Sequence, residues 1–394
     1  MANTLTFDQV ATILADIVSN ATGFNTPVPV DTGEFVAVAQ TGLQVGYDPL
    51  ATAISQVLAK TIFSIRPYSE KFVGLRVDNQ KYGNHVRKLT ALDRDAVNSE
   101  VYGLTDGTSV DQYEVRKPIV LQTNFYGESA YQDFITIYSV QIDNAMKGPE
   151  EFGSFISMII QNMSDRMTQR REEMARSTLA NMIMGVWLDN TNVIHLLTEY
   201  NTFTGGNYTK ITIRQSGNWE PFIKWVYARM NNISDLMTAR SYKFHFNLPQ
   251  YGSNGAFIPR HTPYNRQKMY LSSFEGNYID SAVLSSVFNE DKLKMIDYEP
   301  ISFWQSIDQP AVVEGAPSYM MPDGSFNYDP SDPVTVEDIF GVLFDEEALG
   351  YTITDESVER TPYNARGKYW NQFYSDCKKY WNDFTENFVL FLLD

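Results

Sequence analysis

A long amphipathic stretch, residues 148–185, constrains what this chain can fold into more than any other part of it. Pro149 suits the first position of a helix, and the two glutamates after it place negative charge where the helix dipole favours it. Gly185 supplies a stop signal. The apolar residues recur every three or four positions, at Phe152, Ile156, Ile159, Met163 and Met167. The pattern predicts one helix on the order of 50 Å long, several times the usual length.

The composition allows a substantial core and argues against several kinds of partner. The chain has 394 residues, of which 43% are hydrophobic, with 24 Tyr and 24 Phe that suit β-rich packing and broad subunit contacts. Its net charge of −17 is opposite to that of a free nucleic-acid or anionic-membrane binder. The single cysteine, Cys377, excludes an internal disulfide framework. The chain also lacks the basic start of a secretory signal, and its longest apolar run, residues 388–393, is too short to cross a membrane.

The amino-terminal region has an unusual charge pattern. Residues 1–59 contain no Lys or Arg. Apolar periodicity predicts short helices at residues 7–18 and 50–64. The segment between them, residues 23–48, is rich in Gly, Pro and Thr and predicts an extended arm or loop. We expect this region to pack against the surface of another part of the protein, because it cannot fold on its own.

A basic segment follows. Residues 66–94 carry seven basic residues and three acidic ones. Residues 105–108 read as a turn and residues 114–125 as a strand, so the region predicts a long two-stranded hairpin with too few apolar positions for a core. It is either a solvated hairpin or a basic arm that lies on an acidic neighbour. The second interpretation makes four basic residues candidates for contacts between subunits: Arg76, Lys81, Arg87 and Lys88.

The carboxy-terminal half alternates predicted elements and suggests a compact α/β unit followed by aromatic strands. The expected strands are residues 208–213, 241–248 and 294–306, and the expected helices are residues 219–230, 263–274 and 281–288. Residues 308–359 contain thirteen acidic residues and no basic one. Within them, residues 334–344 predict a strand, and residues 351–393 predict two or three long aromatic strands.

The chain shows no motif of a known chemistry. Its four histidines are scattered, and neighbouring carboxylates such as Glu172 and Glu173 point to different sides of a helix. An ion pair of Glu172 with Arg176 explains them better than acid–base catalysis does. The oxygen-rich residues between 323 and 332 lack the spacing of a calcium loop. We therefore predict no catalytic residue, metal site or cofactor. The arginines of the long helix fit a solvated face: Arg166, Arg170, Arg171 and Arg176.

The order of these parts resembles the major capsid proteins of tailed bacteriophages, which share the Hong Kong ninety-seven capsid fold. The local sequence is most similar to that of small short-tailed phages of Gram-positive hosts. Two stretches carry this likeness: EFGSF at residues 151–155 and NARGKYWN at residues 364–371.

The resemblance implies an α+β fold with five parts. These are an N-terminal arm (residues 1–65), an E-loop hairpin (66–128), a peripheral domain with a long spine helix (129–189), an axial α/β domain (190–345) and strands that return to the peripheral domain (346–394). The apolar stripe of the spine helix would form its core side. Arg166, Arg170 and Arg171 would lie on a possible inner face of the shell.

The implied function is structural and not enzymatic. Hexamers and pentamers would form an icosahedral or prolate shell in the virion, after synthesis in the cytoplasm of the bacterial host. The implied partners are other copies of the chain, a scaffolding protein, a portal and packaged double-stranded DNA held by weak non-specific contact, with no membrane. Two alternatives stay open: a carbohydrate-active hydrolase, whose composition would look similar, and another virion component such as a tail or decoration protein.

Overall fold

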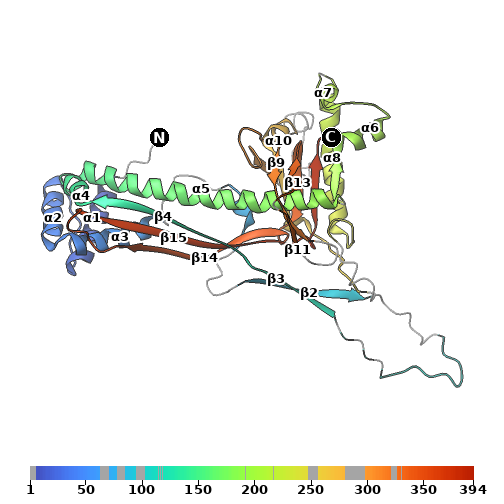
Figure 1. Ribbon diagram of the computed structural model, residues 1–394, viewed down its shortest axis with the longest axis horizontal. Coiled ribbons are helices and arrows are strands. Elements are labelled where there is room, and N and C mark those ends of the chain that lie inside the picture. The colour runs from blue at the N-terminus through green and yellow to red at the C-terminus, as the bar shows by residue number, and fades with distance from the viewer. Residues whose placement is uncertain are drawn as a thin grey trace.

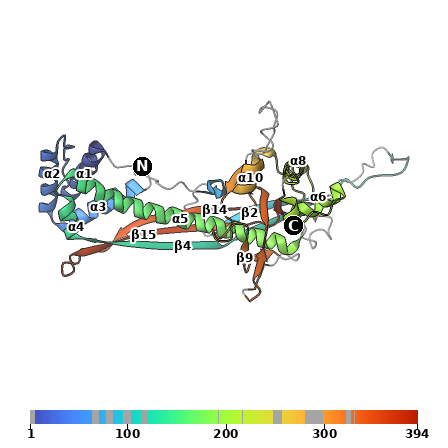
Figure 2. The same ribbon diagram turned by 90° about the horizontal axis from the view of Figure 1, so that it is seen from above.

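The computed structural model describes residues 6–62, 71–77, 85–94, 103–113, 115, 117, 119–190, 192–215, 217–246, 256–279, 298–320, 326–329 and 331–394. The molecule is elongated, and helix α5 (Pro149–Asp189) lies along its longest dimension (Figure 1). A group of helices gathers at the amino-terminal end of α5, a four-stranded sheet runs along its side, and a five-stranded sheet lies at its carboxy-terminal end (Figures 1 and 2).

Helix α5 confirms the main prediction from the sequence and exceeds its predicted length. It begins with Pro149 at the first position and continues through Gly185 to Asp189, where Asn190 ends it in a left-handed conformation at φ 52°. Gly185 serves close packing instead of termination. A Cβ atom at this position would lie 2.5 Å from Cε1 of Phe384, so only glycine lets the segment before the last strand pack against the helix.

Four helices surround the amino-terminal end of α5, and one of them corrects the predicted extended arm. They are α1 (Phe7–Thr22), α2 (Thr32–Val45), α3 (Tyr47–Ile62) and α4 (Ser139–Ala145). Helix α2 lies where an arm was expected, because the Asp31 carboxylate caps it by accepting the Glu34 backbone N–H at 2.7 Å. Phe35 of α2 is fully buried edge-on against Phe152 of α5, with ring centroids 5.8 Å apart.

The four-stranded sheet has the order β1-β14-β15-β4. Its strands are β1 (Arg76–Val77), which follows the short 3-10 helix η1 (Val73–Leu75), and β14 (Leu349–Arg360), β15 (Tyr369–Asn382) and β4 (Gly127–Tyr138). Alternate side chains of β15 are buried, including Trp370 and Tyr374. The predicted aromatic strands of the carboxy-terminal region are confirmed by β14, β15 and the later strand β16 (Phe388–Leu392).

The five-stranded sheet has the order β5-β16-β13-β7-β8. Its other strands are β5 (Val193–His195), β13 (Ile339–Asp345), β7 (Gln267–Ser272) and β8 (Tyr298–Ile301). The helices around it are α6 (Leu196–Thr204), α7 (Lys210–Ile213), α8 (Trp219–Thr238) and α10 (Ser273–Ile279). Two further pairs of short strands lie beside α5: β9 (Val313–Gly315) with β12 (Val334–Val336), and β10 (Ser318–Met320) with β11 (Phe326–Tyr328).

Several predicted elements in this region are corrected. Residues 208–213 contain helix α7 instead of a strand. Residues 263–274 contain the 3-10 helix η3 (Tyr264–Arg266) and strand β7, because three consecutive residues, Met269, Tyr270 and Leu271, are buried between β13 and β8. Residues 334–344 form two strands that are separated at Asp338, whose φ is 55°.

Of the remaining predictions for this region, some agree with the structure in full or in part, and one concerns residues that are not described. Helix α8 confirms and extends the helix predicted at residues 219–230. Strand β8 accounts for part of the strand predicted at residues 294–306. In the described part of 241–248 only an isolated bridge from Ser241 to Arg260 occurs, and the helix predicted at 281–288 lies outside the described residues.

Candidate functional site

A two-stranded ribbon extends from the body of the molecule. Strands β2 (Val86–Arg94) and β3 (Ile119–Phe125) pair in antiparallel register, and β2 also pairs with the short strand β6 (Ala256–Phe257). Between β2 and β3, the described residues 103–113, 115 and 117 lie far from the rest of the chain in both views, and we call them the ribbon tip (Figures 1 and 2). The turn predicted at residues 105–108 is confirmed by a hydrogen bond from Thr108 N to Thr105 O.

The ribbon tip is exposed throughout, although it is not purely polar. Every residue described in it is exposed, including four large apolar side chains: Leu104, Val110, Tyr113 and Val115. Tyr113 and Val115 retain 80% and 78% of their accessible surface. Apolar groups placed this far from the core cannot stabilise the subunit itself, so they are available to a second molecule.

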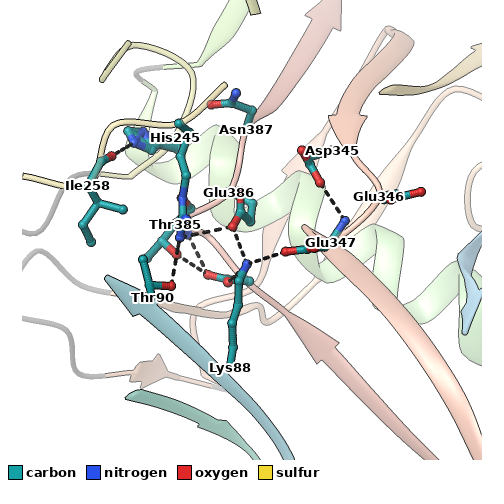
Figure 3. Close-up of polar contacts among 12 residues, drawn as sticks. Lys88, Thr90, His245, Ile258, Asp345, Glu346, Glu347, Thr385, Glu386 and Asn387 are labelled. Atoms are coloured by element: carbon teal, nitrogen blue, oxygen red, sulfur yellow. Dashed lines mark hydrogen bonds and ion pairs between the residues drawn. The ribbon is translucent and has the colours of Figure 1, made fainter. Parts of the chain in front are cut away.

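The base of the ribbon is held by a cluster of ion pairs that we call the ribbon clamp: Lys88, Arg260, Glu347, Asp383 and Glu386 (Figure 3). The Lys88 ammonium of β2 lies 2.8 Å from Asp383 Oδ2 and 3.5 Å from Glu347 Oε2, and it also contacts the Glu386 carboxylate. Asp383 and Glu386 lie in the turn between β15 and β16. Two nearly buried carboxylates therefore tie the ribbon to the centre of the fold.

The charges of the clamp depend on one another. Burial alone would raise the pKa of Asp383, but the Lys88 ammonium and hydrogen bonds from Thr385 hold that pKa below its usual value. Burial raises the pKa of Glu386, and Lys88 and Arg260 only partly offset this effect. For Lys88, burial opposes the charged form, yet the two carboxylates outweigh it and raise the pKa of the ammonium. Lys88 is therefore the main cation that stabilises the buried negative charge of the turn, and Arg260 assists it at Glu386.

Arg260 makes a second set of contacts with the same turn, through Glu386 and Thr385. Its Nη2 lies 3.1 Å from Glu386 Oε1, and its Nε donates to the Thr385 carbonyl oxygen at 2.9 Å. The neighbouring His245 ring is buried, and its Nε2 lies 2.6 Å from the Ile258 carbonyl oxygen (Figure 3). Burial, aided by the Arg260 charge, lowers the pKa of His245 to about 4. The histidine is therefore neutral at physiological pH.

The four contact candidates from the sequence do not share one environment. Arg87 is exposed and Arg76 is partly buried in β1, while Lys81 lies outside the described residues. Lys88 points into the clamp and pairs within its own chain, so its charge is already engaged in the subunit. The rest of the clamp could not be predicted from the sequence. Asp383 and Glu386 lie 295 and 298 positions after Lys88, and nothing in the local sequence indicates that they meet it.

The apolar stripe of α5 forms core contacts where its side chains are described. Phe152, Ile156 and Ile159 each retain 1% of their surface, whereas Met167 is partly exposed. The side chain of Met163 lies outside the described residues. The three buried residues share one cluster with α1, α2, α3 and β15, so this half of the helix seats the amino-terminal helices on the sheet.

The predicted solvated arginine face of α5 is correct for two residues and wrong for two. Arg166 and Arg170 are exposed and pair with Asp133 at 3.1 Å and Glu173 at 2.8 Å. Arg171 is buried, with contacts to the carboxylates of Glu356 and Asp376.

Arg176 is buried as well. It forms the predicted pair with Glu172 at 2.6 Å, and its guanidinium lies 3.7 Å from the centre of the Phe303 ring. The helix is covered on more than one side here, which a single amphipathic pattern does not reveal. Lys378 of β15, fully buried 2.7 Å from Asp376, was also missed.

Within the described residues, other kinds of site are not found. No group of three or more His, Cys, Asp or Glu in the described ranges is placed to hold a metal ion. Among the helices described, none is long and apolar enough to cross a membrane. The described features are a long helix, a sheet along its side and a ribbon whose base is clamped and whose tip is exposed to solvent.

Comparison with known proteins identifies the family. The chain matches the family model of the Phi29-like phage major capsid protein over residues 15–392, and it belongs to that family. Its fold is similar to that of a chain in the capsid structure of Staphylococcus phage Andhra, with a TM-score of 0.53 and 9% identity over 83% of this chain and 84% of that chain. The fold is also similar to that of a chain in the structure of the head fiber and inner core protein gp22 of bacteriophage P68. The TM-score is 0.52 and the sequence identity is 10%, over 83% of this chain and 85% of that chain.

No curated protein matches the chain. The family match and the shared fold confirm the α+β capsid fold and the role of major capsid protein expected from the resemblance. The chain is a component of a phage virion that forms a shell with copies of itself.

Proposed function

We propose that the chain assembles as hexamers and pentamers into an icosahedral or prolate shell around double-stranded DNA, and that it has no enzymatic activity. The observation that carries this proposal is the ribbon tip. Its exposed apolar residues lie beyond the reach of the subunit's own core, so a neighbouring copy is the natural surface to cover them. The order of parts supports the same assignment, with residues 66–128 as the E-loop.

The clamp supports this role by fixing the ribbon before assembly. A contact between subunits loses affinity when binding must first order a segment, and a segment held in advance avoids part of that cost. Lys88 of β2 pairs with the turn between β15 and β16, and Arg260 bridges that turn to β2 by donating to Thr90 Oγ1. Lys88 therefore acts within the subunit, and among the described candidates Arg87 is the exposed cation left to meet a neighbour.

Packaged DNA would meet this shell only weakly. The net charge is −17, and phosphate binding requires basic surface. Arg166 and Arg170 remain candidates for the inner face, but each is already paired with an acidic residue. Arg171 is no longer a candidate for contact with DNA at the inner face, because its side chain is buried. Weak contact would leave the DNA free to move during filling and release.

The other partners and the place of synthesis belong to the proposal as well. A scaffolding protein would guide the curvature of the shell, a portal would occupy one vertex, and the subunit would be made in the cytoplasm of the bacterial host. The domain limits 1–65, 66–128, 129–189, 190–345 and 346–394 are proposed as the working division of the chain, with β16 of the last part assigned to the axial sheet because it pairs with β5 and β13.

The test is assembly of the purified chain, alone and together with the other head proteins of its phage, viewed by electron microscopy. We expect capsomers or closed shells. Rings, tubes or isolated trimers would instead favour a tail or decoration protein, and a monomer under every assembly condition would contradict the proposal. The comparisons lend no support to the hydrolase alternative, which would need two carboxylates about 5–9.5 Å apart in an aromatic cleft.

A further inference from the structure

We propose that the end of the molecule opposite the ribbon tip carries a second contact between copies, in which a basic turn of one subunit binds an apolar, acidic loop of the next. This inference rests on the proposed shell function and names a surface that the ribbon does not supply. The two segments are the apolar loop, residues 23–30 between α1 and α2, and the basic turn, residues 361–368 between β14 and β15.

The apolar loop is well held and yet exposes large apolar side chains. Thr26 N donates to Ser19 Oγ at 2.9 Å, and Val30 N donates to the Glu34 carboxylate at 3.0 Å, so both ends of the loop are fixed. Phe24 and Val30 nevertheless retain 78% of their surface. A loop that is ordered by its own hydrogen bonds and still presents such residues to solvent is typical of a contact surface.

The amino-terminal segment that contains this loop carries charge of one sign. The first 59 residues contain five acidic residues and no Lys or Arg. Asp16 in α1 and Asp31 and Glu34 at the start of α2 are exposed. A neighbour that covers the apolar loop would therefore be favoured if it carried positive charge.

The basic turn offers that charge on a rigid support. Asn364 Oδ1 accepts the backbone N–H groups of Arg366 and Gly367 at 3.1 and 3.0 Å. At the base of the turn, the ring of Tyr363 stacks on Tyr47, with centroids 5.4 Å apart. Arg366 and Lys368 are exposed, and neither forms an ion pair with any residue that the structure describes. Two cations are thus presented on a fixed turn.

The positions of the two segments determine how copies would associate. Both lie at the amino-terminal end of α5, but the turn projects from one side of that end and helices α1 and α2 lie on the other (Figure 2). A contact between unlike surfaces on opposite sides is head-to-tail, and it closes into a ring when the rotation between copies allows. Each copy would give its turn to one neighbour and receive the turn of the other. The ribbon tip, at the far end, is left for separate contacts (Figure 1).

The experiment reverses the charges one side at a time in the full chain. We expect Arg366→Glu with Lys368→Glu to lower the yield of shells about tenfold or more, with an unchanged far-ultraviolet circular dichroism spectrum. Adding Asp16→Lys to this variant should restore part of the assembly, and it leaves Glu34, which fixes the loop, unchanged. The matched control adds Asp308→Lys instead, which gives the same net charge at an exposed position elsewhere and should not restore it.

The outcomes separate this inference from the proposed function. If the wild-type chain forms shells and the variant with both charges of the basic turn reversed does too, the contact does not exist while the shell function stands. The same conclusion follows if the control substitution restores assembly equally well. If the wild-type chain forms no shells or capsomers, the proposed function itself fails, and this contact fails with it.

Crosslinking between introduced cysteines tests the same contact if the charge variants do not fold. In a Cys377→Ser background, Val28→Cys and Arg366→Cys are combined and treated with a short bismaleimide after assembly. We expect a ladder of covalent oligomers that neither single-cysteine variant gives. Assembled shells that contain only uncrosslinked chains would overturn the proposal.

Discussion

At the scale of single residues, the chain places ionisable groups where the sequence gives no warning of burial. Lys88, Arg171, Asp376, Lys378 and Asp383 all have less than a fifth of their side-chain surface exposed. In the sequence they look like ordinary surface residues, because charge is normally a sign of exposure. Only their partners, which are brought together from distant parts of the chain, make their burial tolerable.

Replacing Lys88 by methionine should destabilise the subunit. The Asp383 and Glu386 carboxylates would remain buried without their main cation, and an uncompensated buried charge costs about 3–5 kcal/mol. Because Lys88 retains 19% of its side-chain surface, we expect about 3 kcal/mol, measured by urea unfolding of the unassembled subunit. The control is Arg87→Met on the exposed side of the same strand, which should change stability by less than about 0.5 kcal/mol. Equal effects of the two substitutions would refute the clamp.

The buried His245 predicts a specific dependence of stability on pH. Its pKa is about 4 in the folded chain, below the value of 6.5 for an unperturbed histidine, so the unfolded state binds the extra proton more readily. This term is fully present above pH 6.5 and is lost as the pH falls toward 4. Between pH 7 and pH 5 it should remove about 2 kcal/mol from the free energy of unfolding.

The measurement compares urea unfolding at several pH values for the wild type and for His245→Gln, which cannot titrate. The variant should lose this part of the slope even if it is less stable at every pH. His261→Gln, at an exposed position, serves as the control and should keep the slope. Identical slopes in all three proteins would show that His245 does not titrate in the unfolding reaction.

At the scale of elements, patterns with one dominant face were read correctly and patterns shaped by tertiary contacts were not. The amphipathic stripe in the first half of α5 and the alternating strand β15 agree with their predictions, because each has one clear period. Strand β7 was mistaken for a helix, since a strand buried on both faces shows no alternation. Helix α2 was missed because Gly, Pro and Thr around its cap outweighed the apolar spacing of Phe35 and Ala39.

Gly185 provides a test of how α5 packs. In an exposed helix, replacing glycine by alanine stabilises by about 1 kcal/mol. Here the new Cβ would lie 2.5 Å from Cε1 of Phe384 and 2.9 Å from Cβ of Tyr319, so the helix and its neighbours must separate. We expect Gly185→Ala to lower the thermal midpoint and to destabilise by about 1–3 kcal/mol. Ser177→Ala at an exposed position of the same helix should be neutral or slightly stabilising; a stabilising Gly185→Ala would contradict this packing.

At the scale of the whole molecule, the general plan could be predicted from the sequence but its internal connections could not. The order of a basic hairpin, a long helix, an α/β unit and aromatic strands survives in the structure. What the order does not contain is that Lys88 meets Asp383, 295 positions later, or that residues 361–368 stand beside α3. Such contacts follow from the folded path of the chain, and no local pattern encodes them.

The role of the ribbon tip in assembly can also be tested at the scale of the whole molecule. Because Leu104, Val110, Tyr113 and Val115 are exposed in the subunit, replacing all four by serine should leave the free energy of unfolding within about 0.5 kcal/mol of the wild type. In a shell these side chains would be covered, and burial of apolar surface contributes about 25 cal/mol per Å² at each contact. We therefore expect subunits that remain folded and fail to form shells in electron micrographs.

A conservative variant separates lost apolar contact from a disturbed ribbon. Leu104→Met with Tyr113→Phe keeps the apolar surface and should assemble as the wild type does. The Lys88→Met variant makes a complementary case, because it leaves the tip intact and loosens the base. If the tip supplies the contact and the clamp only orients it, Lys88→Met should slow assembly and retain shells at high protein concentration, whereas the serine variant should form none. Assembly of the serine variant at wild-type yield would mean that the tip plays no part in holding neighbours together.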